Sequence, residues 1–563
     1  MLSLSPQRSP LGWWLNVAAT TIKTRITQAL VGQVLYPETA GETSANATLY
    51  DQSYPPYCAE RYSAGFKAGN SAAQNAAALQ DAINSAAQAG AGIVTIATRG
   101  SFSIDASALY FHYDATNNPN FPSDNHQQGN IILRGQGFMD STAWANGIDQ
   151  GTILDVGSDT LTFGLGVSAS NGLRGCRLEY LTVVGDNDAD VLVRFNFCSR
   201  GTGVDQFSVF NSGNGGGFEF SDCFLIACGY WWAETDTDLG IGMRVYNPTQ
   251  AAGMYDLGVG TVRGFAKGAM VGKEATSGAS SISQVRGFLQ AIACGEGIIC
   301  ARGAKDCRFD LHIESNTTTG FRAWYGATGI TLESVYANQT AATESQISLG
   351  KSGEADSSNN WQDVHINLAR FVTVPANKSA IEVFLTASCQ NFSWRTLVAT
   401  QETAGTGYVI DFNGTSSLHG ARGGLIRTGN AFSANINGSA NVDFYYDADT
   451  LGRKYQQAPI TVTGISDTMV NVASGTDLSW INTGNIWRIT GTTTINTIAA
   501  PTNGNPRLTL LFTGNVTVQD LSTAAGNLAL AGSADFGATS QDVLELFWDG
   551  NSSVWRESSR SVD

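Results

Sequence analysis

Short apolar segments recur through the middle of the chain, from about Ile131 to about Arg427, and turns rich in Gly, Asn and Asp separate them. Apolar and polar residues alternate within 309–313 and again within 364–368, which predicts strands with one buried and one solvent-exposed face. Comparable segments return at intervals of roughly 20–50 residues, with no helical pattern between them. Such units need their neighbours to bury an apolar face, so the pattern predicts a parallel β-helix, a solenoid of stacked strands with a long outer surface.

The two ends of this solenoid carry different patterns. Residues 75–88 are Ala-rich with apolar residues on one helical face, and Gly90 and Gly92 end the pattern. A helix here is expected to cap the first rung and to cover backbone groups that could otherwise pair with another chain. After residue 450, short strands alternate with Gly, Asn, Asp and Pro turns, which predicts a β-sandwich. The predicted domains are residues 37–130 (connector, capping helix and first rungs), 131–450 (parallel β-helix) and 451–563 (β-sandwich).

Residues 1–36 form a separate N-terminal segment. Residues 11–19 are apolar and follow Arg8, but the stretch is short, contains Asn16 and lacks a convincing cleavage site. Residues 20–34 place apolar side chains at helical spacing. No stretch reaches the roughly 20 apolar residues that a membrane-spanning helix needs. We interpret this segment as a short helical docking anchor; an export signal and an unstructured tail are the alternatives.

Composition and charge narrow the class of partner. The 563 residues include 63 Gly but only 12 Pro, 14% are charged, and the formal net charge is −16. This balance argues against disorder, and the negative charge argues against nucleic acid or an anionic membrane surface as a partner. The nine cysteines show no metal-binding or short disulfide spacing, and several lie in apolar strands. We expect buried, reduced thiols and folding in a reducing cytoplasm rather than disulfides.

The segment that opens the solenoid carries recognisable residues. It contains Arg61 and Tyr62, then the helix 75–89, then the run GAGIVTI at Gly90–Ile96. This arrangement resembles the opening segment of the pectate-lyase-like superfamily, especially the version found in bacteriophage tailspikes and polysaccharide depolymerases. The chain departs from the family pattern at residues 67–74, where no Asp is present. In the family that loop is mainly structural.

The C-terminal stretch adds to the resemblance. Residues 507–563 resemble the terminal β-domain of many tailspikes, which commonly helps to trimerise the spike. The resemblance implies an all-β protein, a right-handed parallel β-helix that forms a homotrimer and docks on a phage tail or adaptor protein through residues 1–36. It also implies a virion protein that folds in the host cytoplasm and acts on polysaccharide at the host cell surface. No catalytic residue is transferred, because catalytic positions vary among such spikes.

Stacked rungs constrain which acidic residues can cooperate. Residues at matching positions of adjacent rungs lie about 4.8 Å apart. The two carboxyl groups of a retaining glycosidase are about 5–5.5 Å apart, and those of an inverting enzyme about 6.5–9.5 Å. Outward-facing acids on neighbouring rungs are therefore the candidates for glycosidic cleavage.

The first candidate group is a pair of Trp residues followed by three acids. Trp231 and Trp232 could stack on sugar rings, while Glu234, Asp236 and Asp238 could supply the catalytic acid and base. The alternative is a buried plug at the end of a rung followed by a solvated acidic turn. Both interpretations stay open at this point, with Glu234 the strongest single candidate.

The second candidate group spans three rungs. Alternation turns Asp310 and Glu314 outward, and Glu333 should face the same way on the next rung. The predicted roles are acid and base for Glu314 and Glu333, with Asp310 as a third acid. The alternative is a solvated or trimer-facing polar row. Five further residues are expected to bind substrate: His312, Arg322, Trp324, Tyr325 and His365.

Elimination beside a uronate carboxylate is a second possible reaction. It needs a base such as His312 or His365 and a cation such as Arg308 or Arg322. No GxSxG, P-loop or HExxH motif occurs, so the esterase, NTPase and zinc-protease classes have no support. No cofactor or metal is expected, and the acidic run 186–190 is interpreted as an Asx-rich turn rather than a calcium site.

We therefore expect a phage tailspike that recognises host capsule, O-antigen or exopolysaccharide and cleaves it endolytically, with hydrolysis slightly favoured over lyase chemistry. Two alternatives stay open. One is a receptor-binding tail fibre without catalytic activity. The other is a secreted bacterial polysaccharide lyase or hydrolase.

Overall fold

The structure, a computed structural model, describes residues 35–561 apart from short gaps. The gaps are 124–129, 141–145, 147–150, 165–171, 250–251, 276–280, 340–341, 352, 354–359, 376, 386–388, 402–406, 415–421, 429–433, 438–443, 449–453, 457–460, 463–464, 467–468, 482–484, 502–505 and 522–526. Contacts divide the chain into two compact units, residues 1–417 with 427–436 and residues 418–426 with 437–563. The anchor predicted for residues 1–36 lies almost wholly outside the described residues, and the predicted domain boundaries stay predictions.

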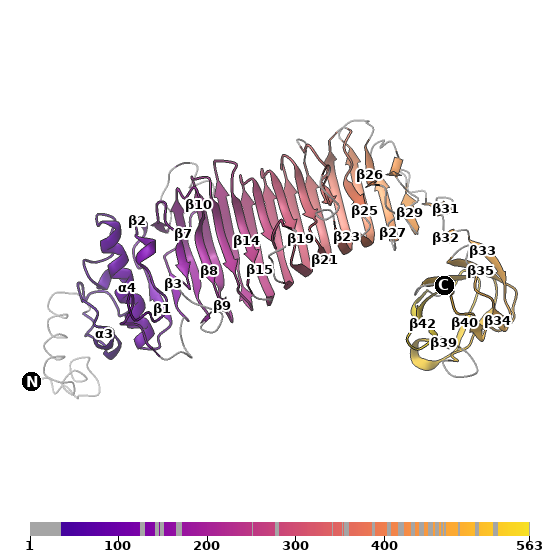
Figure 1. The fold of residues 1–563 in the computed structure, drawn as a ribbon, viewed down its shortest axis with the longest axis horizontal. Helices are drawn as coiled ribbons and strands as arrows, with labels where there is room; N and C mark the ends of the chain where they lie inside the picture. The colour runs from indigo at the N-terminus through magenta and orange to yellow at the C-terminus, as the bar shows by residue number, and fades with distance from the viewer. Residues whose placement is uncertain are drawn as a thin grey trace, which may run out of the picture. The chain divides into compact units, whose positions relative to one another are not determined.

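One long helix covers the first rungs of the first unit. Helix α4 (Ala72–Gln88) begins at a capping box, in which Ser71 accepts a hydrogen bond from the Gln74 amide and the Gln74 side chain accepts one from the Ser71 amide. Its Ala-rich sequence favours a helix, and its apolar face is buried. The helix packs against β1 (Ile93–Thr95) and β2 (Gly100–Ser103) at the end of the strand stack (Figure 1). The short helices of this unit are α3 (Ala40–Ser44), η1 (Ala59–Arg61) and η2 (Ala106–Ala108), and η5 (Ala531–Ser533) lies in the second unit.

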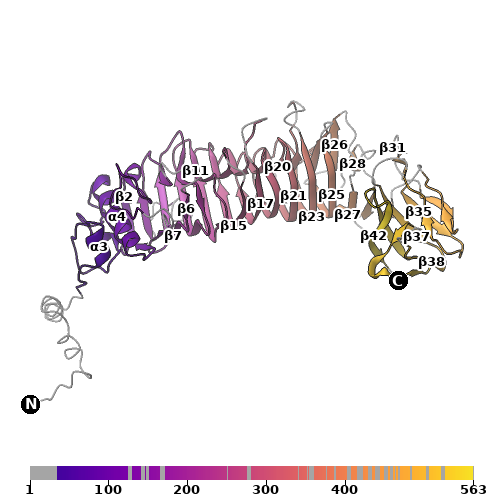
Figure 2. The ribbon, with the colours of Figure 1, turned by 60° about the horizontal axis from the view of Figure 1, so that its bottom comes forward.

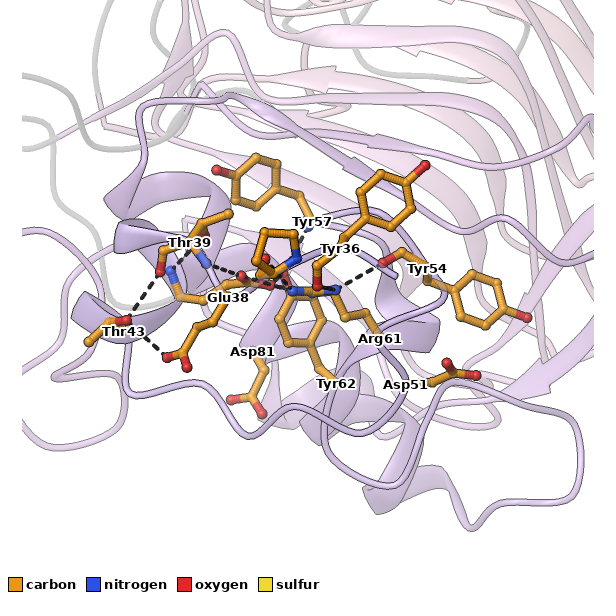
Figure 3. Close-up of polar contacts among 12 residues, drawn as sticks. Tyr36, Glu38, Thr39, Thr43, Asp51, Tyr54, Tyr57, Arg61, Tyr62 and Asp81 are labelled. Atoms are coloured by element: carbon orange, nitrogen blue, oxygen red, sulfur yellow. Dashed lines mark hydrogen bonds and ion pairs between the residues drawn. The ribbon is translucent and has the colours of Figure 1, made fainter. Parts of the chain in front are cut away.

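A buried ion pair ties the start of the described chain to this cap. Arg61 and Glu42 are fully buried and paired, and the Tyr62 hydroxyl also donates to Glu42, at 2.9 Å. The remaining Arg61 N–H groups donate to the main-chain carbonyls of Tyr36, Pro37 and Tyr54 at 3.0–3.1 Å (Figure 3). One guanidinium therefore holds two separate stretches of backbone, residues 36–37 and Tyr54, which gives the Arg-Tyr pair of the opening segment a structural role.

The solenoid is built from two series of strands that pair in parallel. The first series forms the long sheet, which comprises β1, β2, β3 (Ile132–Arg134), β4 (Thr152–Asp155), β7 (Arg177–Gly185), β10 (Gly203–Asn211), β12 (Ile226–Ala227), β13 (Tyr230–Thr235), β15 (Ala252–Arg263), β17 (Ile282–Ile292), β19 (Ala304–Glu314), β21 (Ala327–Asn338), β23 (Trp361–Val374), β25 (Gln390–Gln401), β27 (Arg422–Thr428), β29 (Phe444–Ala448) and β30 (Lys454–Gln456). Its β29–β30 pair is antiparallel. A small parallel pair joins β6 (Leu173–Arg174) to β9 (Cys198–Ser199).

The second series forms the second sheet of the solenoid. It comprises β5 (Leu161–Phe163), β8 (Val191–Asn196), β11 (Gly216–Ser221), β14 (Ile241–Tyr246), β16 (Lys267–Val271), β18 (Glu296–Cys300), β20 (Thr319–Ala323), β22 (Ile347–Leu349), β24 (Ile381–Leu385), β26 (Tyr408–Gly414) and β28 (Ala434–Asn437). From β13 to β29, strands of the two sheets take turns along the sequence, and Figure 2 shows the two series on different sides of the stack. Each rung thus contributes one strand to each sheet, as a parallel β-helix requires.

Matching inward positions stack into columns inside the solenoid. In the second sheet Phe195 lies in register between Phe163 and Phe220, with ring centroids 4.8 and 5.1 Å apart. The column continues through Val245 and Val271, both of which are buried. Each inward side chain therefore buries its apolar surface against the rungs before and after it, which is the stabilisation that the recurring pattern predicted.

A column of left-handed residues bends consecutive strands of the long sheet at the same place. The strand registers align six residues with φ between 51° and 67°, which are Met254, Gln284, Asp306, Gly329, Asp363 and Asn391. The last two are joined by a 2.6 Å hydrogen bond from the Asn391 amide to the Asp363 carboxylate. A non-Gly residue in this conformation is unfavourable, so the repeated pairing on both sides of the bend must hold it.

A close contact beside Trp231 provides a test of the packing. Gly260 lies in register with Trp231, and a Cβ on Gly260 would lie 1.9 Å from the indole ring. We expect Gly260→Ala to lower the free energy of unfolding by about 1–3 kcal/mol, because the rigid ring has to shift. Gly69→Ala, where a Cβ meets nothing within 4 Å, is the matched control. Equal thermal unfolding temperatures for the two variants would contradict this packing.

The second unit contains its own apolar core. A six-stranded sheet joins β33 (Val470–Ala473), β35 (Ile486–Thr490), β37 (Arg507–Phe512), β41 (Val543–Asp549), β42 (Val554–Ser561) and β39 (Leu528–Ala529). The smaller pairs are β31 (Thr461–Val462) with β32 (Ile465–Ser466), β34 (Asp477–Leu478) with β36 (Thr497–Ile498), and β38 (Val516–Val518) with β40 (Phe536–Ala538). Trp487 and Trp555 lie fully buried in one cluster that draws residues from the large sheet and from the last two pairs. The first three strands of the large sheet are parallel, whereas β37, β41 and β42 are antiparallel.

The cysteines follow the core pattern. All nine lie within the described residues as thiols, and every one except Cys228 is buried. Burial raises the pKa of the Cys58 and Cys294 thiols to about 12, so these thiols are protonated and unreactive at neutral pH. Among the helices that the structure describes, none is long and apolar enough to cross a membrane.

Candidate functional site

The first predicted group divides between the two sides of β13. Trp231 points into the core, where it is 1% exposed and its indole N–H donates to the Leu257 carbonyl at 2.7 Å. The prediction that Trp231 stacks on sugar is therefore wrong, because strand alternation places only one of two consecutive Trp residues outside. Trp232 is the outward one, and it packs half-buried against Met139 and Phe210.

Glu234 shares the outward side with Trp232. The Trp232 indole donates to one carboxylate oxygen at 2.8 Å, and Arg263 on the next rung lies 3.3 Å from the other. Burial raises the pKa of Glu234, and these two partners only partly offset that effect. Asp236 and Asp238 lie exposed in the turn that follows. Glu234 thus has a structural ion pair, and its role in chemistry stays a prediction, as do the roles of the two Asp residues.

The second predicted group partly assembles around an open hollow on the outer face of the long sheet. Asp310, Glu333 and Arg308 line this hollow of about 430 Å³ on two adjacent rungs. The Ser334 hydroxyl donates to Asp310, and Glu333 contacts Arg308 at 3.6 Å and also accepts from the Asn367 amide. In β21, Leu332 pairs with Phe309 and Ser334 pairs with Asp310, so Glu333 between them is the extra residue of a β-bulge. The extra residue aims its carboxylate outward, next to Asp310.

Glu314 lies too far along the strand to act with Glu333. Glu314 is in register with Asn338 and follows Asp310, the residue beside Glu333, by four residues along β19. Four residues correspond to roughly 13 Å along the strand at 3.3 Å per residue. That separation exceeds the range of about 5–9.5 Å for glycosidase carboxyl pairs, so the predicted Glu314–Glu333 acid/base pair is wrong. Glu314 instead lies 3.6 Å from His312, whose ring packs edge-on against Tyr336.

Three of the predicted substrate-binding residues lie on or beside the second sheet. Arg322 on β20 is fully buried, 2.6 Å from Glu344 and 3.2 Å from Glu296, and it donates to the Gly350 carbonyl at 2.7 Å. Trp324 is 3% exposed in an apolar cluster and packs against Tyr325, with ring centroids 4.5 Å apart. These three residues lie on another face than Asp310, because the chain turns a corner between β19 and β20, and their predicted contact with substrate stays a prediction.

His365 lies on the outer face of the long sheet, within a hydrogen-bonded chain. Its ring nitrogens lie 2.6 Å from the Ser393 hydroxyl and 2.8 Å from the Asn367 side-chain oxygen. Asn367 in turn donates to Glu333. His365 therefore positions the amide that holds a carboxylate of the hollow, and its predicted contact with substrate stays a prediction.

The hollow also contains Arg286, Asp256, Phe288 and Val259, which the sequence interpretation missed. Arg286 lies in register with Arg308 on the adjacent rung, and the two side chains are 71% and 70% exposed. Asp256 pairs with Arg286 at 2.8 Å, and Phe288 and Val259 expose apolar surface beside them. The alternation of residues 285–290 (VRGFLQ) would have placed Arg286 and Phe288 outward. Their convergence with Asp310 becomes visible only in the register.

Comparisons with known proteins give weak likenesses. No family model and no curated protein matches the sequence. The tailspike gp61 of Pseudomonas phage phi297 is 12% identical, covering 66% of this chain and 75% of its own, with a TM-score of 0.38. A mutant tailspike of E. coli bacteriophage HK620, in complex with a pentasaccharide, is 11% identical over 79% of this chain and 76% of its own, at 0.39. The A-module of the Azotobacter vinelandii mannuronan C-5 epimerase AlgE6 is 11% identical over 66% and 94%, at 0.34.

Most of the similar structures are phage tailspikes. Identities and TM-scores this low support no argument about activity. The fold class of the chain rests on its own strand pairing. Strands of successive rungs pair in parallel and form a parallel β-helix, which confirms the predicted all-β fold. The predicted handedness, the homotrimer and the β-sandwich stay predictions. In the described part of the chain, no three His, Cys, Asp or Glu side chains are placed to hold a metal ion.

Proposed function

We propose that this chain is a bacteriophage tailspike that binds a bacterial surface polysaccharide, such as capsule, O-antigen or exopolysaccharide, and cleaves it endolytically. The observation that carries the proposal is the open hollow of the long sheet. There, two exposed guanidinium groups, three carboxylates and an exposed aromatic ring converge on consecutive rungs.

These groups match the chemistry of a sugar polymer. Arg286 and Arg308 offer several N–H donors to hydroxyl or carboxylate oxygens, and the exposed face of Phe288 can cover the apolar face of a sugar ring. Asp310 and Glu333 accept hydrogen bonds from sugar hydroxyls. The outward ladder continues through Thr261, Gln290 and His312, joined at 3.2 and 3.3 Å, so polar groups extend along several rungs. A polymer running along the stack would meet similar groups at each rung.

Assembly and attachment belong to the same proposal. A homotrimer would give the spike three copies of this face, and residues 1–36 would dock on a phage tail or adaptor protein. Light scattering of the purified full chain tests the trimer, with three times the chain mass of 59.5 kDa expected. Retention of residues 1–36 in purified virions, read by N-terminal sequencing, would contradict a secreted bacterial enzyme.

The proposed activity is tested with purified bacterial capsular, O-antigen and exopolysaccharides. Binding is measured by calorimetry, and cleavage by size-exclusion chromatography of the polymer after incubation with the full chain. We expect one class to be bound and shortened. Binding without shortening would indicate a receptor-binding spike that lacks catalytic activity, and no binding to any polymer would contradict the proposal.

The hollow itself is tested by removing its cations. The double variant Arg286→Ala/Arg308→Ala is expected to weaken polysaccharide binding by about tenfold or more, because charge-assisted hydrogen bonds contribute about 1.5–3 kcal/mol when they are made. Arg556→Ala, in the second unit, removes a partly exposed, ion-paired guanidinium and serves as the control. Unchanged affinity in the double variant would place the glycan on another face.

A further inference from the structure

A second, smaller hollow adjoins the hollow of the long sheet on the same outer face. It has a volume of about 310 Å³, and Asp256 and Arg286 line both hollows. We call it the side trough, and its other outward-facing walls are Leu225, Ala227, Met254 and Gln284. The Asp256–Arg286 ion pair therefore forms the partition between the two hollows. A substituent on a sugar held in the hollow of the long sheet would reach the side trough by crossing this pair.

The side trough lies between two columns of residues on three consecutive rungs. The first column is left-handed, with φ of 55°, 67° and 57° at Leu225, Met254 and Gln284. The residue that follows each of them is buried in the core. The next position faces outward again and forms the second column, Ala227, Asp256 and Arg286. Ala227 has only a methyl group where the following rungs have long polar side chains, and this difference opens the trough at one end.

Apolar side chains form the walls of the side trough away from the ion pair. Met254 is 56% exposed, and Leu225 is partly buried beside it. Exposed apolar surface is unfavourable in water, so a methyl group placed between Met254, Leu225 and Ala227 would remove apolar surface of both partners from water. The trough therefore favours a small apolar group over a hydroxyl group.

The ion pair at the partition determines which polar group fits beside that methyl. Arg286 donates from Nε and Nη2 to one oxygen of Asp256, at 3.2 and 2.8 Å. The Nη1 hydrogens of Arg286 have no partner in the part of the chain that the structure describes, and the side chain is 71% exposed. Asp256 already balances the guanidinium charge and would repel a second carboxylate. A neutral carbonyl oxygen can instead accept from Nη1 without that repulsion.

We propose that the side trough binds an acetyl substituent of the polysaccharide. The methyl group packs against Met254 and Leu225, and the carbonyl oxygen accepts a hydrogen bond from Arg286. This inference rests on the proposed function, since the sugar that carries the acetyl group is held in the hollow of the long sheet. An O-acetyl ester and an N-acetyl amide both present a methyl group next to a neutral carbonyl. Met254 and Arg286 are then specificity-determining residues for an acetylated polymer.

Other common sugar substituents match the side trough less well. A uronate or pyruvate group would bring a carboxylate towards Asp256. A hydroxyl group would lie against the apolar Met254 side chain without a hydrogen bond. The methyl group of a 6-deoxy sugar would fit the apolar walls but has no oxygen for Arg286. Acetyl is the substituent that uses both the apolar walls and the available N–H groups.

The experiment uses the full-length protein and the polysaccharide that it binds among the capsular, O-antigen and exopolysaccharides. Calorimetry compares three forms of that polymer: untreated, deacetylated with alkali, and deacetylated then treated with acetic anhydride in aqueous bicarbonate, which restores only the amides. We expect deacetylation to weaken binding by about tenfold or more, because a methyl contact and a hydrogen bond from a charged donor are both lost. Affinity that returns on re-N-acetylation assigns an amide, and affinity that stays low assigns an ester.

Met254→Gln tests the side trough itself. Gln284 occupies the same left-handed position on the next rung, so the backbone there accommodates a Gln side chain. The variant should lower the preference for untreated over deacetylated polymer by about threefold or more, because the methyl group loses its apolar wall. Leu239→Gln, at a residue that is 46% exposed and lines neither hollow, is the matched control and should keep the wild-type preference. Both variants should unfold at the wild-type temperature.

The outcomes that overturn the inference differ from those that overturn the proposed function. Wild-type affinity that deacetylation leaves unchanged overturns the acetyl assignment while the proposed function stands, and so does a preference that Met254→Gln leaves unchanged. Weaker binding by Met254→Gln to a polymer whose deacetylation has no effect assigns the trough to another apolar substituent, which also overturns the inference. A wild-type protein that binds none of the polysaccharides overturns both proposals.

Discussion

Arg61→Ala is expected to lower the free energy of unfolding of the N-terminal cap by about 3–5 kcal/mol, the range for removing one partner of a buried ion pair. The substitution leaves the fully buried Glu42 carboxylate without its cation. It also removes the N–H donors of the Tyr36, Pro37 and Tyr54 carbonyls (Figure 3). Hydrogen exchange of α3 and η1 amides should report the loss directly, because these short helices depend on that single side chain.

The same pair gives this cap a defined pH dependence. Burial acts to raise the pKa of Glu42, but hydrogen bonds from Arg61, the Thr39 amide and Tyr62 outweigh it, so the pKa lies below its usual value. The folded state therefore binds this proton less readily than the unfolded chain does. Its contribution to stability is present above the unfolded pKa of about 4.3 and is lost as pH falls through the lowered folded value. Protection of α3 should fall in this acidic range.

Two controls distinguish the ion pair from general damage. Lys67→Ala removes an exposed cation near Tyr50 and is expected to change stability by less than about 1 kcal/mol. The double variant Arg61→Met/Glu42→Leu removes both charges, and it should recover part of the loss because no charge stays buried alone. Wild-type protection in Arg61→Ala would contradict the structural role assigned to this pair.

Arg322→Ala is expected to be similarly destabilising, by about 3–5 kcal/mol, in the middle of the second sheet. Arg322 is fully buried and lies between Glu296 and Glu344, and the first of these acids is itself 8% exposed. Its removal leaves two carboxylates facing each other across a poorly solvated space. Hydrogen exchange of β18, β20 and β22 should accelerate, while the hollow of the long sheet should keep its polysaccharide affinity.

Lys351→Ala is the matched control for Arg322. Lys351 lies 3.9 Å from Glu296 but is one-third exposed, so we expect a change of less than about 1 kcal/mol. A substrate-binding role for Arg322 predicts the opposite result, with normal strand protection and weaker binding of polymer. That outcome would restore the interpretation made from the sequence.

The alternation within single strands predicted side-chain direction well. Asp310 and Glu234 face outward, and Phe309, Leu311 and Ile313 are buried, as a period of two requires. The Trp231–Trp232 pair shows that residue type alone does not identify a sugar-binding platform. Both side chains could stack on a sugar ring, but strand alternation requires one of two consecutive residues to point inward, and that residue is Trp231.

Arg322 and Trp324 show a different limit. They follow Glu314 by only eight and ten residues, yet the corner between β19 and β20 places them on another sheet. Asp256 and Arg286 show the reverse, since 30 residues separate them in sequence and a single rung separates them in space. Loop length in a solenoid varies freely, so distance along the chain says little about which side chains meet.

The sequence by itself determined that strands recur, which side chains of a strand face the core, and where a helix covers the first rung, because these depend on local periodicity and capping. The tertiary structure alone decided which outward residues share a column: Arg286 with Arg308, Glu333 beside Asp310, and Asp256 with Arg286. The physical reason is that register is set by hydrogen bonds between rungs and by bulges such as the one at Glu333. Both arise from pairing between distant segments, and no local pattern contains them.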